Sequence, residues 1–382
     1  MEDQSHTQIA TFTSRRQFLV QAGVAVLAAA AAPAAAIAGN PPPGPTDGTT
    51  IMDFERKLKR MRFEHYRHPP VDILKEGFRP VGGKIADFAT ARQGGRDHFF
   101  YIERRLQEGT PFYPGHEIYF GHASTADFFA WEVHDPVMLV RPGTWEEAHV
   151  WAPCILAEKA QFIMAYTGLN RHLSQDIGLA SSRDLFEWKR WPGNPLSPCR
   201  NAPWAAWWDD DIASCRDPHL LRHDGRVWMV YTANTREGAA CLALASSRDF
   251  KRWKDHGPII TGPTAGYEPS LTGGHLQGSF ESANLSFREG RWLLLTKAPI
   301  RNAAVRTWAA VSERPDKFDL EQMWPFWKDA IGVEVVRNQG TRSLVAGMVG
   351  GYLRFAEVDW AETRPSAREI KDRETLRGWN PV

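Results

Sequence analysis

The sequence repeats one nine-residue motif three times, as ASTADFFAW (residues 123–131), ASSRDLFEW (residues 180–188) and ASSRDFKRW (residues 245–253). The copies share the pattern A-S-x-x-D-[FL]-x-x-W. The second and third follow aromatic, β-branched segments, QFIMAYT (residues 161–167) and VWMVYTA (residues 227–233). Such segments are typical of strands. The chain therefore contains a repeating unit of roughly 60 residues built from short strands and turns.

This repeat predicts an all-β fold, a five-bladed β-propeller of four-stranded blades. Units of this length fill the chain from Val81 to its C-terminus five times. In each motif the Ser and Asp side chains can bond the backbone of a turn, and the Trp can pack between blades. A pair of β-sandwiches is the alternative, but it does not explain one motif recurring three times. Only DFERKLKRMR (residues 53–62) has the pattern of an amphipathic helix.

The N-terminal segment has the pattern of an export signal. SRRQFL (residues 14–19) carries adjacent arginines, an alanine-rich apolar run follows, and AIA (residues 36–38) matches a cleavage signal. We therefore expect residues 1–38 to be a twin-arginine signal peptide. The twin-arginine translocase of a bacterium would then export the protein to the periplasm or the medium. A transmembrane anchor is the alternative, but the alanine-rich run is weakly hydrophobic and no second span follows.

The rest of the chain divides into a short segment and one large domain. Residues 39–78 are expected to be a linker and short N-terminal segment that begins with the stiff, polar NPPPGPTDG (residues 40–48). Residues 79–382 are expected to form the propeller, which carries the catalytic site. The formal net charge of +1 gives no electrostatic case for binding nucleic acid or for stable membrane association.

The four cysteines give no metal-binding pattern. They are irregularly spaced and form no C-x-x-C pair, so a cysteine zinc site is not expected: Cys154, Cys199, Cys215 and Cys241. Export permits disulfides. Either a Cys199–Cys215 disulfide or free, buried cysteines fit the sequence.

Three acidic residues are placed to meet in the channel of the propeller. The innermost strands of all blades converge there, and in each unit that strand should precede the aromatic strand. Read in this way, the first, third and fourth units contribute Asp87 in KIADFAT, Asp217 in SCRDPHLL and Glu281 in SFESANL. Carboxylates far apart in the sequence can therefore form one site.

With these features the chain resembles the five-bladed propeller glycosidases, the superfamily that includes glycoside hydrolase families 32, 43 and 68. The matching stretches are RDP (residues 216–218), the block from VWAPCIL to FIMAYTG (residues 150–168), the SSRDLFEW turn (residues 181–188) and Glu281. The resemblance spans about residues 80–360, in register with the blade repeat. It implies a glycosidase that acts on a glycoside or oligosaccharide.

The resemblance also implies roles for the three acids, because their order is similar to the nucleophile-or-base, middle aspartate and acid of those families. Glycoside hydrolysis needs one protonated carboxyl group at the leaving oxygen and one carboxylate opposite it. Glu281 would be the acid, or the acid/base. Asp87 would be the nucleophile of a retaining mechanism or the base of an inverting one. Asp217 would hold sugar hydroxyls and raise the pKa of the acid, with Arg216 keeping Asp217 ionised.

The first of these acids departs from the family pattern. The invertase-like families usually have Asn-Asp-Pro there, whereas this chain has Ala86-Asp87-Phe88. Asp97 is the nearest substitute, but it lies at a hairpin in GGRDHFFYI and is expected to be exposed.

A tryptophan-rich acidic loop is expected over the mouth of the channel. WWDDD immediately precedes the third inner strand, so Trp207 and Trp208 can stack on sugar faces while Asp210 accepts hydrogen bonds from hydroxyls. Trp151 is a second stacking candidate, with packing between blades as its alternative. A calcium site at residues 209–211 is the rival interpretation, but three consecutive acids cannot easily all turn toward one ion.

The histidines form no metal-ligand spacing in the sequence: His98, His116, His122, His219 and His275. Some relatives hold a cation with a histidine in the last blade, but no histidine follows His275. We therefore predict no required metal and no cofactor.

The sequence thus predicts an exported glycoside hydrolase acting on furanosides or short oligosaccharides. No C-terminal β-sandwich fits into the residues after Trp360, which favours the propeller-only families. Fructosides, arabinofuranosides and xylosides are therefore equally expected as substrates. A fructosyltransferase-like enzyme would use the same acids. A sugar-binding propeller without activity and a protein-interaction propeller are the alternatives outside the enzymes.

Overall fold

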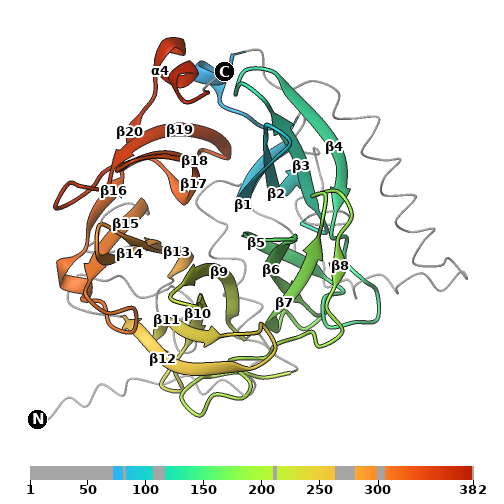
Figure 1. Cartoon of the computed structure of the whole chain (residues 1–382). Helices are drawn as coiled ribbons and strands as arrows, with labels where there is room; N and C mark the ends of the chain where they lie inside the picture. The colour runs from blue at the N-terminus through green and yellow to red at the C-terminus, as the bar shows by residue number, and fades with distance from the viewer. Residues whose placement is uncertain are drawn as a thin grey trace, which may run out of the picture.

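A computed structural model describes residues 72–80, 83–105, 117–209, 213–262, 280–298 and 306–380. Within them, five four-stranded antiparallel sheets surround a common centre (Figure 1). The predicted five-bladed β-propeller of four-stranded blades is confirmed. The expected signal peptide and the amphipathic run at residues 53–62 lie outside the described residues.

Each blade consists of four consecutive strands, the first next to the centre and the fourth at the rim. The strands have these bounds: β1 (Gly83–Gln93), β2 (Arg96–Arg105), β3 (Phe120–Thr125) and β4 (Trp131–Val137) in blade 1; β5 (His149–Glu158), β6 (Gln161–Leu169), β7 (Gln175–Ser182) and β8 (Lys189–Arg190) in blade 2; β9 (Cys215–His223), β10 (Arg226–Asn234), β11 (Ala240–Ser247) and β12 (Trp253–Thr261) in blade 3; β13 (Glu281–Arg288), β14 (Arg291–Ala298), β15 (Arg306–Ser312) and β16 (Trp324–Trp327) in blade 4; β17 (Ile331–Gln339), β18 (Arg342–Val349), β19 (Tyr352–Asp359) and β20 (Arg368–Glu369) in blade 5. The described helices are short: α3 (Ile73–Glu76), η2 (Leu320–Gln322) and α4 (Arg373–Gly378).

The repeated motif forms the turn between the third and fourth strands of blades 1 to 3. In blade 2, the Ser182 hydroxyl accepts a hydrogen bond from the backbone N–H of Leu185 at 2.9 Å, and the Asp184 carboxylate accepts one from Phe186 at 2.9 Å. Leu185 has a φ of 68°, and its carbonyl accepts the indole N–H of Trp188 at 3.2 Å. Blade 1 makes all three corresponding bonds, and blade 3 makes those of the Asp and Trp side chains. The expected bonds of the motif Asp are therefore present. The hydroxyl that bonds the turn belongs to the residue after the shared Ser, namely Thr125, Ser182 or Ser247, whereas the shared Ser124 and Ser246 bond histidines.

The motif tryptophans pack at the junctions between blades. Trp131 stacks on Phe78 with ring centroids 4.0 Å apart, and it lies 6.4 Å from Phe355 of blade 5. Trp188 of blade 2 meets Phe100 of blade 1 edge-on at 5.8 Å. Large aromatic surfaces are thereby removed from water where two sheets meet, which stabilises the junctions.

Blade 5 closes the ring against blade 1. Arg337 of β17 donates through Nε to the carboxylate of Asp97 on β2 at 3.1 Å. Phe78 and Leu353 also exchange two backbone hydrogen bonds of 2.9 Å. Asp97 is only 1% exposed, so the expectation that it lies exposed is wrong. A buried carboxylate needs a paired charge, and Arg337 supplies it from the other end of the chain.

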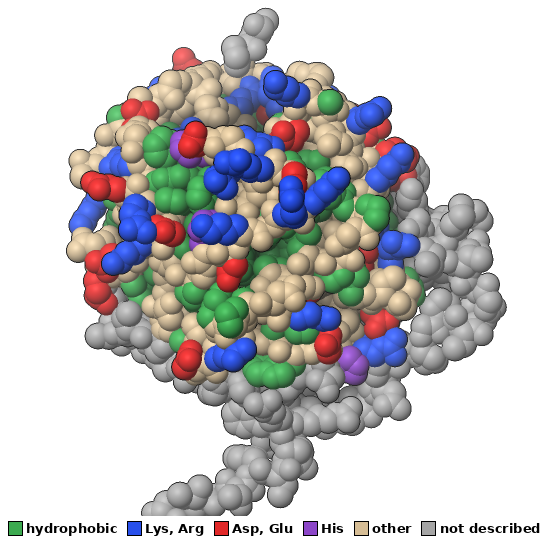
Figure 2. All heavy atoms as spheres, turned by 60° about the horizontal axis from the view of Figure 1, so that its bottom comes forward, with side chains coloured by type: hydrophobic (Ala, Val, Ile, Leu, Met, Phe, Trp, Pro, Cys, Tyr) green, Lys and Arg blue, Asp and Glu red, His purple; other side chains and the backbone are tan. Residues whose placement is uncertain are grey.

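The surface carries mixed charge. Figure 2 shows basic and acidic side chains interspersed over one face, with apolar side chains between them. None of the described helices has the length and apolar character needed to span a bilayer. The four cysteines, all within the described ranges, are free and buried, so the structure contains no Cys199–Cys215 disulfide.

Every innermost strand is irregular at the same level of the channel. The regular pairing with the second strand stops at five matching positions and resumes a few residues later: Ile85, Trp151, Arg216, Glu281 and Ile331. Such β-bulges bend a strand and re-aim its side chains, and they are common beside active sites. The five bulges thus form one ring of redirected residues around the centre.

Candidate active site

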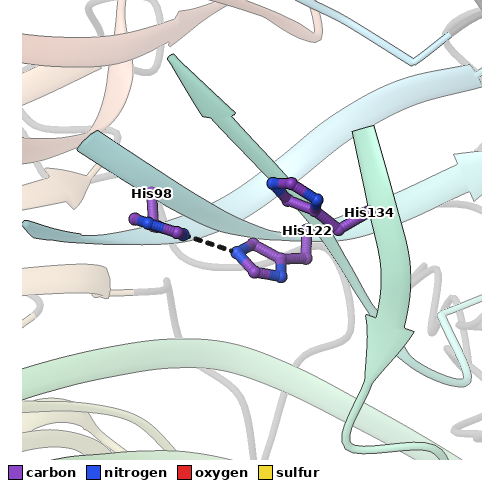
Figure 3. A group of neighbouring side chains, drawn as sticks. All are labelled: His98, His122 and His134. Carbon is purple, nitrogen blue, oxygen red and sulfur yellow. Dashed lines mark hydrogen bonds between the residues drawn. The ribbon is translucent and has the colours of Figure 1, made fainter. Parts of the chain in front are cut away.

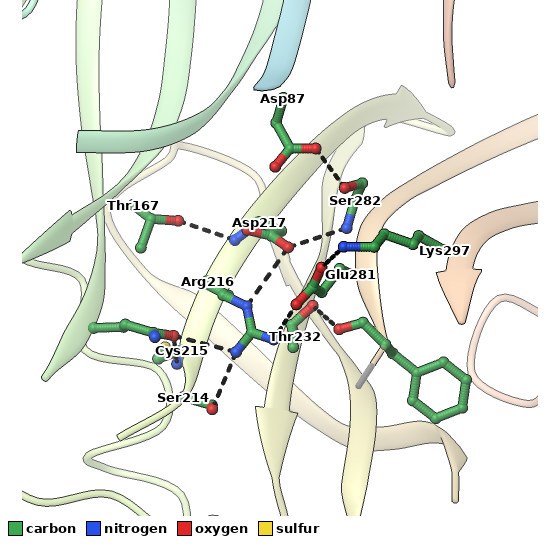
Figure 4. Close-up of polar contacts among 12 residues, drawn as sticks. Asp87, Thr167, Ser214, Cys215, Arg216, Asp217, Thr232, Glu281, Ser282 and Lys297 are labelled. Atoms are coloured by element: carbon green, nitrogen blue, oxygen red, sulfur yellow. Dashed lines mark hydrogen bonds and ion pairs between the residues drawn. The ribbon is translucent and has the colours of Figure 1, made fainter. Parts of the chain in front are cut away.

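The three acids predicted from the sequence lie together in this ring. Asp87 comes from β1, Asp217 from β9 and Glu281 from β13. Ser282 joins them, because its hydroxyl donates to Asp87 and its backbone N–H donates to Asp217 at 3.0 Å (Figure 4). Asp87 and Ser282 are 195 positions apart in the chain, and the blade arrangement alone makes them neighbours.

The bulges hold two of these residues in an unusual backbone conformation. Asp217 has a φ of 55° and Ser282 a φ of 49°, and the two occupy the same position in blades 3 and 4. Positive φ is uncommon for residues other than glycine and persists where the surroundings impose it. At Asp217 those surroundings include Thr167 of the neighbouring blade, whose hydroxyl accepts the backbone N–H of Asp217 at 2.9 Å.

Arg216 lies between two of the acids. Its Nη2 donates to Glu281 at 3.2 Å, and its Nε is 3.7 Å from a carboxylate oxygen of Asp217. Its Nη1 contacts the hydroxyl of Ser214 at 3.1 Å and the side-chain oxygen of Gln175 at 3.4 Å. The guanidinium group is therefore fixed, and it links the acids of blades 3 and 4 (Figure 4).

Lys297 is a second cation at the site, and sequence reasoning missed it. It pairs with Glu281 across β13 and β14, and its ammonium group forms an ion pair with that carboxylate. Burial by itself would lower the pKa of Lys297, but the charge of Glu281 and the hydrogen bond to it raise that pKa above its usual value. One feature of the sequence could have indicated Lys297: it lies on the second strand of the blade, at the position that pairs with Glu281.

The other two acids have pKa values shifted upward. Burial and the nearby charge of Asp87 raise the pKa of Asp217 to about 7, although Arg216 acts in the opposite direction. Arg216 therefore favours the ionised form of Asp217, as expected, although burial has the larger effect on the pKa of that carboxyl group. Burial also raises the pKa of Asp87, and the hydrogen bond from Ser282 partly offsets it.

A fourth carboxyl group, Glu334, faces the same region from β17 of blade 5. Asn284 donates to it through its amide at 3.0 Å, and Nε2 of His219 lies 3.8 Å from the same oxygen. Burial raises the pKa of Glu334 well above its usual range, and the charge of Asp87 adds to the rise. Sequence reasoning missed this residue because blade 5 carries no copy of the repeated motif that would have given its register.

The position of Trp151 is compatible with both of its expected roles, stacking on a sugar ring and packing between blades. In blade 2 it occupies the position that Glu281 occupies in blade 4, immediately before the bulge. It is half-buried, it stacks on His149 at a centroid distance of 5.5 Å, and it packs against the apolar cluster between blades 1 and 2.

Trp207 is connected to the acids through two intervening residues, Gln175 and Arg216. Its indole N–H donates to the backbone carbonyl of Gln175 at 2.8 Å, and the side chain of Gln175 reaches Arg216. The guanidinium group of Arg200 lies 4.3 Å from the centre of the Trp207 ring. Trp208, beside it, is also half-buried.

The acidic part of this loop is only partly described. Asp209 forms an ion pair with Arg200, which leaves that carboxylate engaged by a cation of the protein. Asp210, a predicted substrate-binding residue, and Asp211, the third acid of the alternative calcium site, lie outside the described residues.

The histidines noted in the sequence lie in different parts of the fold. His219 lies beside Glu334, and its Nδ1 accepts the backbone N–H of Leu285 at 3.3 Å. His98 and His122 lie on the second and third strands of blade 1, outside the ring of acids, and His134 joins them there. His116 and His275 lie outside the described residues. Sequence spacing could not predict the grouping, because its members come from three separate strands.

Comparison with known proteins gives a family match and a shared fold. Residues 91–268 match the model of the glycosyl hydrolases family 32 N-terminal domain. That stretch contains Asp217 but ends before Glu281 and begins after Asp87. No curated protein matches the sequence as a whole.

Similar solved structures include glycosidases of two families. The GH32 beta-fructofuranosidase of Bombyx mori superposes with a TM-score of 0.61 at 14% identity, over 84% of this chain and 70% of that one. Fructan 1-exohydrolase IIa of Cichorium intybus gives 0.57 at 17% identity, over 78% of this chain and 60% of that one. An exo-1,5-alpha-L-arabinanase from a bovine ruminal metagenomic library gives 0.51 at 14% identity, over 76% and 98%. The family match on this fold supports a glycosidase.

Proposed function

We propose that this glycosidase is exported and hydrolyses furanosides or short oligosaccharides of fructoside, arabinofuranoside or xyloside type. The observation that carries the proposal is the convergence of Asp87, Asp217 and Glu281 from three blades on one level of the channel, with Ser282 joining two of them. Paired carboxyl groups flanking one bond are what glycoside hydrolysis requires.

The proposed roles follow from the chemistry of that bond. Asp87 acts on the anomeric carbon, directly as nucleophile or through a water as base, and Glu281 transfers the proton at the leaving oxygen. Asp217 accepts hydrogen bonds from sugar hydroxyls next to the reacting carbon. The separation of the two reacting carboxyl groups decides between retention at about 5–5.5 Å and inversion at about 6.5–9.5 Å. NMR of the first-formed anomer distinguishes these outcomes.

Two residues, Glu281 and Glu334, are candidates for the proton donor. Contacts with Arg216 and Lys297 favour the ionised form of Glu281, whereas a general acid must be protonated before the reaction. Glu281 can serve as acid if the bound sugar displaces Lys297 from it. Glu334, whose pKa is raised by burial, is the alternative donor. Separate Glu281→Gln and Glu334→Gln variants therefore belong in the same experiment.

Further residues are proposed to contact the sugar. Trp207 and Trp208 of the loop before β9, and Trp151 of β5, offer indole faces for the apolar faces of sugar rings. Arg216 and Asp210 offer charged hydrogen-bonding groups to hydroxyls. The connection from Trp207 through Gln175 to Arg216 supports placing the first stacking platform next to the acids.

The names of the similar structures guide the choice of substrates to test. They refer to a beta-fructofuranosidase, a fructan exohydrolase and an arabinanase, so fructosides and arabinosides come first in the screen. The direct experiment is a screen of aryl glycosides and natural oligosaccharides with wild type and Glu281→Gln. Release of sugar to water supports hydrolysis, and transfer to a second sugar supports the glycosyltransferring alternative. Calorimetric binding of an oligosaccharide that is never cleaved would contradict the proposed activity.

Export rests on the N-terminal pattern, which carries its own prediction. Replacing both Arg15 and Arg16 by Lys should abolish export, because the paired guanidinium groups are the address that the translocase receptor reads. The measurement is the amount of protein in periplasmic and cytoplasmic fractions. An undiminished periplasmic fraction in the double variant would overturn the twin-arginine proposal.

A further inference from the structure

Three histidines gather in blade 1 on three adjacent strands. His98 lies on β2, His122 on β3 and His134 on β4, and one ring nitrogen of each lies within 4.8 Å of the others (Figure 3). Nδ1 of His98 and Nε2 of His122 share a hydrogen bond of 2.9 Å. One of these nitrogens donates and the other accepts, so at least one lone pair points into the group.

We propose that His98, His122 and His134 form a binding site for a divalent transition-metal cation such as Zn²⁺. Three neutral imidazoles suit zinc, copper and nickel, whereas calcium and magnesium prefer oxygen ligands. Three protein ligands leave a fourth position for water. Tetrahedral zinc with bonds of about 2.0–2.1 Å needs ligand nitrogens about 3.3 Å apart, so side-chain movements on the order of 1 Å bring these rings into place.

The neighbouring side chains orient one of the ligands. The hydroxyl of Ser124 shares a hydrogen bond of 2.8 Å with Nε2 of His134, and Arg96 donates to the same hydroxyl at 2.9 Å. On the other side of the ring, Glu132 lies 3.9 Å from Nδ1 of His134. Whichever nitrogen of His134 takes the metal, the other keeps a polar partner, and such partners fix the orientation and tautomer of ligating histidines.

Blade 3 contains the same frame without the other two histidines. There Ser246 and Nε2 of His256 share a hydrogen bond of 2.8 Å, as Ser124 and His134 do in blade 1. The Ser–His pair alone is therefore an element of the blade. It does not by itself explain why further imidazoles accompany it in blade 1.

Blade 1 differs from the corresponding positions of other blades at two of its three histidines. The strand register aligns His98 with Trp228 of blade 3, since they pair with the corresponding serines. His122 precedes the repeated motif, where blades 2 and 3 have Leu179 and Leu244, both completely buried. An apolar residue fits this position in the other two blades, so packing of the core does not require a histidine here. A role as a metal ligand accounts for the imidazole in blade 1.

An aromatic side chain separates the group from solvent. The ring of Phe186, from the motif turn of blade 2, lies 5.0–5.7 Å from the three imidazole centroids. Phe186 is 48% exposed, and His98 and His122 are buried beneath it. A cation can therefore reach the site by displacement of one surface residue, and the apolar ring limits water access once the metal is bound.

A metal here would join three strands of one blade beneath a turn of the next. Because the cation would bind the folded chain and not the unfolded one, binding should raise the thermal stability of the protein. The ligands lie on the second to fourth strands, not on the innermost strand that carries Asp87. The expected readout is therefore binding and stability, separate from glycosidase activity.

The experiment uses the full mature chain without a polyhistidine tag, treated with chelator and dialysed. Titration with Zn²⁺ by calorimetry should show one site with a dissociation constant of micromolar or below, and the Tm should rise at saturating zinc. Titration with Co²⁺ should give the intense visible absorption of a tetrahedral site. His122→Leu, which copies blades 2 and 3, should weaken binding at least 100-fold while the protein stays folded by circular dichroism.

The matched control is His256→Gln, which alters the corresponding histidine of blade 3 and should leave metal binding unchanged. His98→Gln is a second test if His122→Leu fails to fold. Absence of a stoichiometric site in the wild type, or equal binding by wild type, His122→Leu and His98→Gln, would overturn the proposal.

Discussion

At the scale of single residues, the acids of the channel differ in their partners. Glu281 contacts Arg216 and Lys297. Asp217, one position beyond Arg216, is 6% exposed and has another acid nearby, so its pKa is raised to about 7. A carboxyl group with a raised pKa beside one that contacts two cations is the kind of arrangement that acid–base catalysis uses.

This difference predicts a pH-dependent effect of Asp217→Asn. A raised pKa in the folded state means that folding favours the protonated form. The contribution of Asp217 to stability is therefore full below about pH 4 and is lost as the pH rises through about 7. Asparagine mimics the protonated carboxyl group and tolerates positive φ. We expect the Tm of the variant to equal that of the wild type at pH 4 and to be higher at pH 8. The corresponding gain in the free energy of unfolding at pH 8 is up to about 4 kcal/mol.

Thermal melts of both proteins between pH 4 and pH 8 check this prediction. Asp209→Asn is the control, because Asp209 is exposed in the neighbouring loop and its replacement should give a flat difference. A Tm difference for Asp217→Asn that does not change with pH would contradict the raised pKa.

Sequence reasoning found the acids that follow a recognisable register and missed the others. Asp87, Asp217 and Glu281 each precede an aromatic strand, so the blade repeat placed them on innermost strands. Lys297 and Glu334 have no such marker. Their positions depend on which residue pairs across a bulge and on the proximity of blades 1 and 5, neither of which the local pattern encodes.

At the scale of elements, the motif turns are held by side-chain bonds to the backbone. Asp184 accepts the N–H groups of Phe186 and Glu187, and these bonds lower its pKa. A lowered pKa stabilises the fold above the ordinary titration range of aspartate, and this stabilisation is lost as the pH falls through the depressed value.

We predict that Asp184→Ala destabilises the protein by about 1 kcal/mol at pH 7, the usual size for lost hydrogen bonds at an exposed turn. Urea unfolding at pH 7 measures the effect, which should shrink as the pH is lowered toward the pKa of the wild-type residue. Glu187→Ala is the matched control, because the Glu187 carboxylate lies in the same turn and accepts none of the described backbone hydrogen bonds of that turn. Equal losses in the two variants would count against the proposed role of the Asp184 carboxylate.

The motif turns were predictable and the bulges were not. Asp and Trp at fixed spacing indicate a turn directly, since their side chains make its bonds. A bulge depends instead on backbone conformations such as the positive φ of Ala152, Asp217 and Ser282, none of which is glycine. Tertiary contacts impose those conformations, and a local sequence pattern does not reveal them.

At the scale of the whole molecule, a buried ion pair joins the last blade to the first. The side chains of Asp97 and Arg337 are 2% and 8% exposed, and the backbone carbonyl of Trp379 also accepts from Arg337. The repeat predicted the number of blades correctly. It did not predict this closure, because Asp97 in a hairpin sequence has the appearance of a surface residue.

We predict that Arg337→Ala destabilises the protein by about 3 kcal/mol, the lower end of the usual cost of breaking a buried pair, since the buried Asp97 keeps the half-exposed Arg92 as an ionic partner. Arg342→Ala, which removes a half-exposed pair with Glu357, is the control and should cost about 0–1 kcal/mol. Denaturant unfolding measures both. Similar costs for the two variants would show that the ring does not depend on this pair.

The central claim, that acids from three blades cleave a glycosidic bond, is tested most directly by the kinetics of Glu281→Gln. The measurement compares kcat/KM for a natural oligosaccharide with a poor leaving group and for an activated aryl glycoside, using substrates that the wild type cleaves. The account predicts a loss on the order of 10²–10⁴-fold for the oligosaccharide and a smaller loss for the aryl glycoside, because only the former needs the proton. Wild-type turnover of the oligosaccharide by a folded Glu281→Gln variant would contradict it.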